Sequence, residues 1–167
     1  MKISSTRHSA RPTRKRHTVI LFSAGGFTFA IEAKAVDEIR ETAGLATFAT
    51  RLSKVEHSLI RQGRRYFVVS AARHFRIKET PTSRLMLLAG VPVGVLVDGI
   101  DRMQEIHSLQ ALPEAFRGEE RNWYRGLTVI RGHVVPLVRP EAFLSKAEIT
   151  LLNASVCTSE RAAAVTA

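Results

Sequence analysis

The feature that most constrains this fold is an internal repeat of about 60 residues. Residues 26–39 (GFTFAIEAKAVDEI) align with residues 90–103 (GVPVGVLVDGIDRM) at a constant offset of 64, so that glycine, apolar and acidic positions coincide. A looser echo aligns residues 59–75 with residues 127–144 at an offset of about 69, which indicates an insertion within residues 108–122. Because such a unit is too long for a solenoid, we expect a duplicated small domain.

Each copy of the repeat is predicted to hold five short β-strands. Apolar alternation with a period of two and β-branched residues mark the strands, and Gly25-Gly26 and Gln62-Gly63 supply turns between them. The predicted strands are residues 18–23, 27–31, 36–41, 58–61 and 65–70, then 84–89, 92–97, 100–107, 127–131 and 133–139. Short strands with little helix favour a mainly β fold of two five-stranded barrels, with alternate apolar side chains in their lumens.

The end of the chain carries weaker helix signals. Pro140 followed by Glu-Ala-Phe-Leu indicates a short helix with proline in its first turn. The stretch AEITLLNA, residues 147–154, indicates a helix that is then expected to fray. We therefore predict that residues 147–167 form a flexible C-terminal tail.

The formal charge of +10 comes mainly from the N-terminus. Residues 1–17 hold six bases and no acid, whereas the rest of the chain carries 19 bases against 15 acids. This segment is rich in Ser, Thr and Arg and has no hydrophobic periodicity, so we expect a disordered basic tail. Such a tail can touch nucleic acid or an anionic membrane, and a solvated leader that adds solubility is the favoured interpretation.

The sequence contains no stretch that could span a membrane. The longest apolar run, residues 85–97, is interrupted by Gly90, Pro92 and Gly94 and is shorter than the roughly 18 residues a spanning helix needs. No cleavage signal follows the basic N-terminus, so we expect neither a signal peptide nor membrane insertion. The single Cys157 cannot form an internal disulfide, which fits a reducing compartment, and we expect a cytoplasmic protein.

No combination of residues predicts catalysis or a metal site. The histidines show no ligand spacing; they are His8, His17, His57, His74, His107 and His133. Asp98 and Asp101 resemble the catalytic turn of aspartic proteases only faintly, because Gly99 replaces the required hydroxyl residue and Lys34 stands at the equivalent place of the first copy. We expect these carboxylates to cap a turn. The sequence therefore predicts a protein that is not an enzyme and binds no cofactor.

The hairpin RQGRRYF, residues 61–67, is basic and aromatic, as in barrels that bind oligonucleotides. The competing interpretation is a hairpin tip with solvated arginines and aromatic side chains turned into the core, where Phe27, Phe29 and Phe67 fall at inward places of the alternation. A basic nucleic-acid-binding β-barrel is kept as the alternative function. A doubled scaffold without an active site is more typical of an adaptor.

The ordered series ILF-x-x-GG-x-x-FAI-x-x-x-x-V-x-EI-x-E, followed by VGVLVDGIDRMQEI and YRGLTVIRGHVVPLV, resembles the CheW domain of bacterial chemotaxis over residues 18–146. This resemblance implies two intertwined five-stranded SH3-like barrels, the first over residues 18–79 and the second over residues 83–146. It also implies a non-enzymatic coupling protein. Its partners would be the regulatory domain of a CheA-type histidine kinase and the cytoplasmic tip of a chemoreceptor, bound as a helical hairpin in a groove.

The resemblance assigns tentative partner-binding residues. Val36 and Glu38 match positions that help receptor contact in the family. The family's Arg before the first-copy glycine, important for receptor engagement, is replaced here by Gln62, and Arg61 comes one place earlier. If both positions lay on a strand, Arg61 would point to the opposite face. Further on, Ser70 replaces the family's Asp.

Overall fold

A computed structural model describes residues 16–165, so the tail predicted for residues 1–17 lies outside the described residues except for Arg16 and His17. The first copy forms strands β1 (His17–Ala24), β2 (Phe27–Glu32), β3 (Val36–Arg40), β4 (Ala46–Thr47), β5 (Val55–Arg61) and β6 (Arg64–Ser70). The second copy forms β7 (Arg84–Leu88), β8 (Val93–Val97), β9 (Gly99–Ile106), β10 (Tyr124–Ile130) and β11 (His133–Val138). The mainly β architecture and all ten predicted strands are confirmed.

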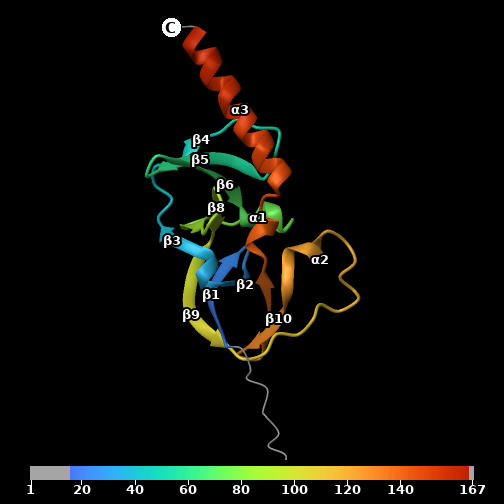
Figure 1. The fold of residues 1–167 in the computed structure, drawn as a ribbon. Coiled ribbons are helices and arrows are strands. Elements are labelled where there is room, and N and C mark those ends of the chain that lie inside the picture. Colours follow the sequence, from blue (N-terminus) through green and yellow to red (C-terminus); the bar gives the residue numbers. More distant parts are fainter. Residues whose placement is uncertain (1–15, 166–167) are drawn as a thin grey trace, which may run out of the picture.

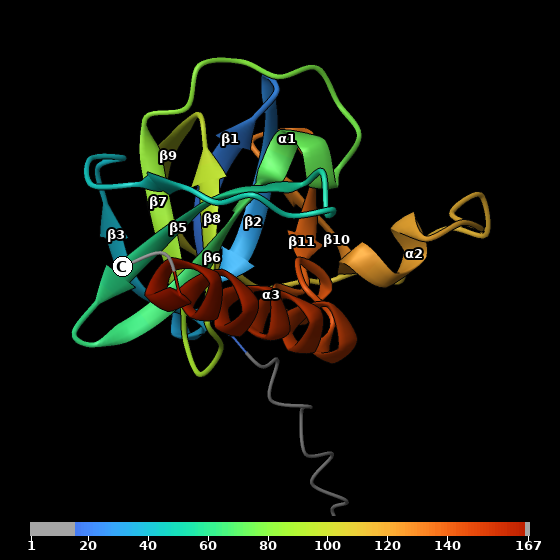
Figure 2. The same cartoon turned by 90° about the horizontal axis from the view of Figure 1, so that it is seen from above.

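The helices are short except for the last one. They are the 3-10 helices η1 (Ala33–Ala35) and η2 (Pro140–Ala142) and the α-helices α1 (Ala71–His74), α2 (Glu120–Trp123) and α3 (Lys146–Val165). Pro140 opens η2, as predicted. Helix α2 lies at the end of the predicted insertion, which bulges away from the sheets on the side opposite β3 (Figures 1 and 2).

Both sheets combine strands from both copies. One sheet has the order β10-β11-β2-β1-β9 and the other β3-β7-β8-β6-β5-β4. Each therefore holds the first hairpin of one copy beside the later strands of the other, joined by a parallel pair. In these pairs Leu137 lies opposite Ala30 and Val68 lies opposite Gly94. The copies are intertwined, as the resemblance implied, and the boundary between residues 79 and 83 does not separate the sheets.

A bent segment of chain connects the two edges of each sheet. In the six-stranded sheet, β3 and β4 form opposite edges although they follow one another along the chain, and Ala46 in β4 pairs with Ser58 in β5. In the five-stranded sheet, Gln110 lies four residues beyond β9 and exchanges backbone hydrogen bonds of 2.8 and 2.9 Å with Leu127 in β10. Each sheet therefore curls until its edges meet, as in a barrel.

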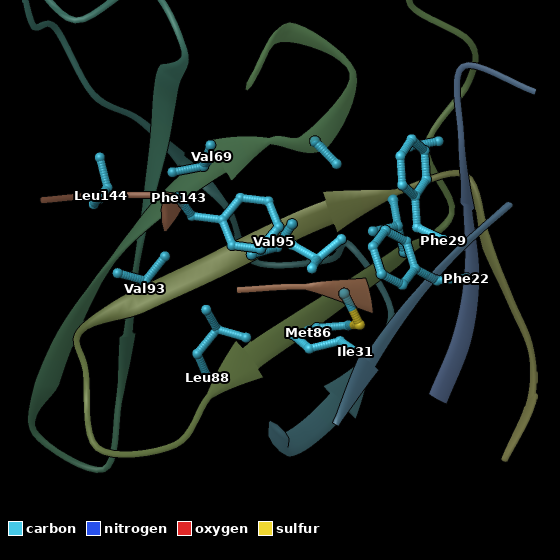
Figure 3. Packing of buried hydrophobic residues seen from close by; sticks show 14 of the residues in the cluster. Phe22, Phe29, Ile31, Val69, Met86, Leu88, Val93, Val95, Phe143 and Leu144 are labelled. Atoms are coloured by element: carbon cyan, nitrogen blue, oxygen red, sulfur yellow. The ribbon is translucent and has the colours of Figure 1, made fainter. Parts of the chain in front are cut away.

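Apolar side chains form one cluster inside each curled sheet and a larger cluster between the sheets. Strand β1 serves two clusters, since Val19 and Leu21 point into the five-stranded curl while Ile20 and Phe22 point between the sheets. This double burial explains why the strand is a continuous apolar run. Aromatic residues were expected inside the barrels, but Phe22 and Phe29 lie in the core between the sheets (Figure 3).

The prediction that Phe27 points inward is wrong, because its side chain is 61% exposed. Phe27 directly follows the Gly25-Gly26 turn and pairs with Ala24, whereas the neighbouring strand β9 extends only as far as Ser23 on β1. At this end the hairpin therefore extends past its neighbouring strand. Alternation predicts burial only where another element covers the strand.

Helix α3 begins where predicted but does not fray after Ala154, since it continues to Val165. Its start is a capping box: Ser145 N–H donates to the Glu148 carboxylate at 2.8 Å, and Glu148 N–H donates to the Ser145 hydroxyl at 3.1 Å. Leu152 is fully buried in the core between the sheets. Farther along, Glu160 pairs with Arg65 of β6 at 3.3 Å, which holds the later turns near the six-stranded sheet (Figure 2).

The exchange of hairpins predicts that neither copy folds alone. Separate fragments of residues 1–80 and 81–167 should each lack a cooperative thermal transition by circular dichroism, because each loses strands of both sheets. The first lacks β7 to β11, and the second lacks β1 to β6. An equimolar mixture should recover the β-sheet spectrum and a transition. Cooperative unfolding of either isolated fragment would contradict the observed topology.

Two adjacent leucines of α3 provide a matched test of helix docking. Leu152→Ala should lower the free energy of unfolding by about 2–5 kcal/mol, because it leaves a cavity in the core. Leu151 is 62% exposed, so Leu151→Ala should change stability by no more than about 0.5 kcal/mol. Urea denaturation measures both values, and equal effects would show that α3 does not pack as described.

Candidate partner-binding site

The four residues that the sequence assigned to partner binding lie on β3 and on the hairpin of β5 and β6. Strand β3 is one edge of the six-stranded sheet, and β5 lies one strand from the other edge. Curling of the sheet nevertheless brings Glu38 of β3 to Arg61 of β5, where Arg61 Nε donates a hydrogen bond of 3.2 Å to Glu38 Oε2. The structure thus brings together two of the predicted residues.

The ion pair between Glu38 and Arg61 is accessible to solvent. The side chains are 35% and 43% exposed, and a second guanidinium, that of Arg40, lies 4.0 Å from the other carboxylate oxygen. Exposed pairs of this kind contribute little to stability, because water and salt screen the attraction. Both groups can therefore exchange their present partner for one on another protein at small cost.

Gln62 lies in the turn that follows β5, with a φ of +51°, and Gly63 follows with a φ of +72°. Positive φ at both central positions is typical of a type I′ hairpin turn. Strand alternation therefore ends at Arg61, so the expectation of opposite faces, which applied only if both positions lay on a strand, does not apply here. The Arg61 guanidinium reaches Glu38.

Val36 connects this corner to the core. It is half-buried and packs against the apolar cluster between the sheets, and it pairs with Leu88 at the start of the β3–β7 ladder. A bulge between Val36 and Glu38 interrupts the ladder. Such bulges change the direction in which the following side chains point.

Sequence reasoning missed three residues at this corner. Ile39 and Ile60 are 41% and 62% exposed. Each is next in sequence to a member of the ion pair, so its side chain points to the opposite face of the strand. Arg40 is the third, because its guanidinium approaches Glu38. In the sequence, Ile39 and its equivalent Met103 are both apolar, but only the structure shows that both are exposed. Exposed apolar side chains on strands that also carry accessible charges indicate an interaction surface.

Ser70, which stands where the family has Asp, has a structural role. Its hydroxyl accepts a hydrogen bond of 3.3 Å from Arg73 N–H and so caps helix α1. Asp and Ser are both good caps at such a position, so the replacement leaves the local fold intact.

The predicted turn cap at Asp98 is confirmed as well, because its carboxylate accepts from Gly26 N–H at 3.2 Å and thereby joins the two copies.

The hairpin aromatics that suggested oligonucleotide binding are buried. Tyr66 is 8% exposed and Phe67 is fully buried, so neither presents a free face for stacking. Two of the hairpin arginines are paired with acids, Arg61 with Glu38 and Arg65 with Glu160. The hairpin therefore resembles an ordinary barrel turn more than a nucleic-acid surface.

A polar groove of about 960 Å³ lies between α1, α2 and the start of α3. Most of its charges already have partners, such as Lys54 with Glu148 at 2.9 Å and Arg76 with Glu119 at 2.5 Å. At the groove, burial lowers the pKa of His74 to about 4, an effect that the positive charge of Lys54 strengthens. His74 is thus a neutral side chain packed among aromatic rings.

Within residues 16–165, no set of three or more His, Cys, Asp and Glu side chains is arranged to hold a metal ion. None of the helices in this part of the chain has the length and apolar content needed to cross a membrane.

Comparison with known proteins gives a family match over most of the chain. Residues 18–148 match the family model described as the CheW-like domain. A solved structure, the scaffolding protein TtCheW from Thermoanaerobacter tengcongensis, superposes with a TM-score of 0.67 at 14% identity, covering 75% of this chain and 90% of that one. No curated protein matches the sequence.

The exposed ion pair predicts weak coupling between its members. A double-mutant cycle of Glu38→Gln and Arg61→Ala in urea denaturation should give about 0.2–1 kcal/mol, falling further in 1 M salt. The less exposed pair of Lys54 and Glu148 is the matched control and should show the larger coupling. A coupling above about 2 kcal/mol at Glu38 would mark a structural lock instead of an available contact.

Proposed function

This chain belongs to the CheW-like domain family, and from that premise we propose that it is a non-enzymatic coupling protein of a bacterial chemosensory system. In this proposal one surface binds the regulatory domain of a CheA-type histidine kinase, and another binds the cytoplasmic tip of a chemoreceptor. Both partners act on the cytoplasmic side of the membrane, so we place the protein in the cytoplasm.

The observation that carries the proposal is the accessible corner of the six-stranded sheet. Val36 and Glu38 match positions that the family resemblance assigns to receptor contact, and Glu38 is bonded to Arg61 of the exposed hairpin. Ile39 and Ile60 add exposed apolar area on the opposite faces of the same strands. The accessible charges suit the charged margin of an amphipathic receptor helix.

We further propose that Arg61 supplies the guanidinium that the family carries at the position of Gln62. Arg61 is one residue away from Gln62, 43% exposed, and oriented by Glu38. A receptor carboxylate can then form a charge-assisted hydrogen bond with a guanidinium that is already positioned. The contact competes with Glu38, which predicts binding that is more sensitive to salt than direct contact with an unpaired arginine.

The test of the function uses isothermal titration calorimetry of the full chain against two separate partners. One is the regulatory domain of a CheA-type kinase, and the other is a receptor-tip fragment. Saturable binding to both supports a coupling protein. Binding to the kinase alone would contradict the proposed receptor contact and leave a kinase-binding variant. Binding to neither would contradict the adaptor function while leaving the fold unaffected.

The role of Arg61 can be separated from general charge effects. Arg61→Ala should weaken receptor-tip binding by about tenfold, because one charge-assisted hydrogen bond is lost. Arg64→Ala removes the same charge from the same hairpin, where Arg64 lies over the Tyr66 ring at 5.4 Å, and should have little effect. Kinase binding should stay unchanged in both variants, which controls for folding. Equal losses in the two variants would refute a specific role for Arg61.

A further inference from the structure

The hairpin of β10 and β11 carries an exposed apolar strip on its outer face. Val129 and Val134 lie directly opposite each other and are 55% and 63% exposed. The next pair along the hairpin on the same face, Leu127 and Pro136, is half-buried. Contiguous exposed apolar side chains on a soluble domain indicate an interaction surface. We call this set of four residues the β10–β11 strip.

The internal repeat provides an equivalent hairpin, that of β5 and β6, with which this strip can be compared. At the offset of 69, the pair Val129 and Val134 corresponds to Ile60 and Arg65 on the hairpin of β5 and β6. In the same way, Leu127 and Pro136 correspond to Ser58 and Phe67. The two hairpins thus present the same face of the same ladder in the two sheets.

The two equivalent faces differ in what covers them. On the first-copy face, Ser58 and Phe67 are buried, and helix α3 lies beside them with Glu160 bonded to Arg65. Helix α3 rises past β5 and β4 and does not extend along β10 (Figure 1). The open face therefore carries Leu127 and Val134 where the first-copy face carries a serine and an arginine, whereas Val129 and its equivalent Ile60 are both apolar and exposed. If solvent exposure alone decided which residues lie where, the polar residues would lie on the open face and the apolar residues on the covered face.

The charge around the strip has one sign. Residues 124–139 contain no acid, and their bases are Arg125, Arg131, His133 and Arg139. Arg125 is bonded to Glu32 at 2.5 Å and Arg139 lies 3.9 Å from Glu141. Within residues 16–165 no ion pair involves Arg131, which projects from the turn at a φ of +51°. A partner that complements this surface must bring apolar and acidic groups together.

We propose that the β10–β11 strip is a docking surface for an amphipathic helix of a partner protein, with an acidic margin that faces Arg131. Helix α3 shows on the equivalent face how such a helix is held. Its apolar residues Ile149, Leu152 and Val156 recur at helical spacing, and its Glu160 pairs with the hairpin arginine. The proposal does not depend on the receptor contact proposed at Arg61, which lies on the other sheet.

The test is a titration of the ¹⁵N-labelled full chain with designed helical peptides, followed by NMR. One peptide has three heptads with leucines at positions a and d and glutamates at e and g, and its matched control has lysines in place of the glutamates. The glutamate peptide should cause saturable shifts that are centred on β10 and β11. Its affinity should exceed that of the lysine peptide by at least about tenfold.

Surface variants make the assignment specific. Val129→Glu and Arg131→Glu should each reduce the affinity for the glutamate peptide by about tenfold or more, since they remove apolar area and add repulsion. Met103→Glu changes an apolar residue of equal exposure, 62%, on β9 and should leave binding unchanged. All three positions are exposed, so the variants should keep the wild-type melting temperature.

Three results would overturn the proposal. The first is an absence of saturable shifts, and the second is equal affinity for the two peptides. The third is concentration-dependent broadening of β10 and β11 signals without peptide, because that would assign the strip to a second copy of this chain.

Discussion

The structure depends on the strand pairs that join the two copies. In each sheet the exchanged hairpin is held on one side by a parallel pair, β2 with β11 or β6 with β8, and on the other by an antiparallel pair, β1 with β9 or β7 with β3. In the parallel pairs, equivalent positions hold Ala30 and Gly94, and a Cβ on Gly94 would lie 3.0 Å from a Leu85 methyl. Small residues at this point let the strands pack over the crowded interior of the curl. Because the hairpins are exchanged, neither copy can complete a sheet on its own. Both copies contribute side chains to the core between the sheets.

Local sequence patterns predicted the strands well but could not reveal this exchange. Alternation and turn residues specify where a strand lies and which face is apolar, and these signals are the same whichever copy supplies the neighbouring strand. The repeat itself added to the ambiguity, since equal units offer each hairpin two equivalent partners. The intertwining of the copies was expected only from the family resemblance. The long continuous apolar run of β1 agrees with it, because such a strand needs cover on both faces.

Periodicity fails as a guide at the ends of elements. Phe27 adjoins a tight turn, where the neighbouring strand ends, and Gln62 lies in a second turn, where positive φ replaces extended backbone and strand alternation no longer applies. Helix α3 is the opposite case. Its later turns offer few apolar residues to the core, so the sequence did not indicate them, yet the helix continues to Val165 and Glu160 lies 3.3 Å from Arg65, which is far away along the chain. Such contacts have no local signature, so the candidate site was predicted as a set of positions and its geometry was not.

The two copies have diverged in sequence, so the corner that holds Glu38 and Arg61 differs from the equivalent corner of the second copy. Glu38 and Arg61, which form the ion pair of the first corner, correspond in the second copy to Arg102 and to Ile130, which is buried. The second corner therefore cannot form this pair, and its equivalent face remains uncovered and apolar. A scaffold that joins unlike partners needs surfaces that do not compete for the same ligand. Duplication provides two similar sheets, and α3 together with the insertion before β10 removes their symmetry, so that the two equivalent corners present different side chains.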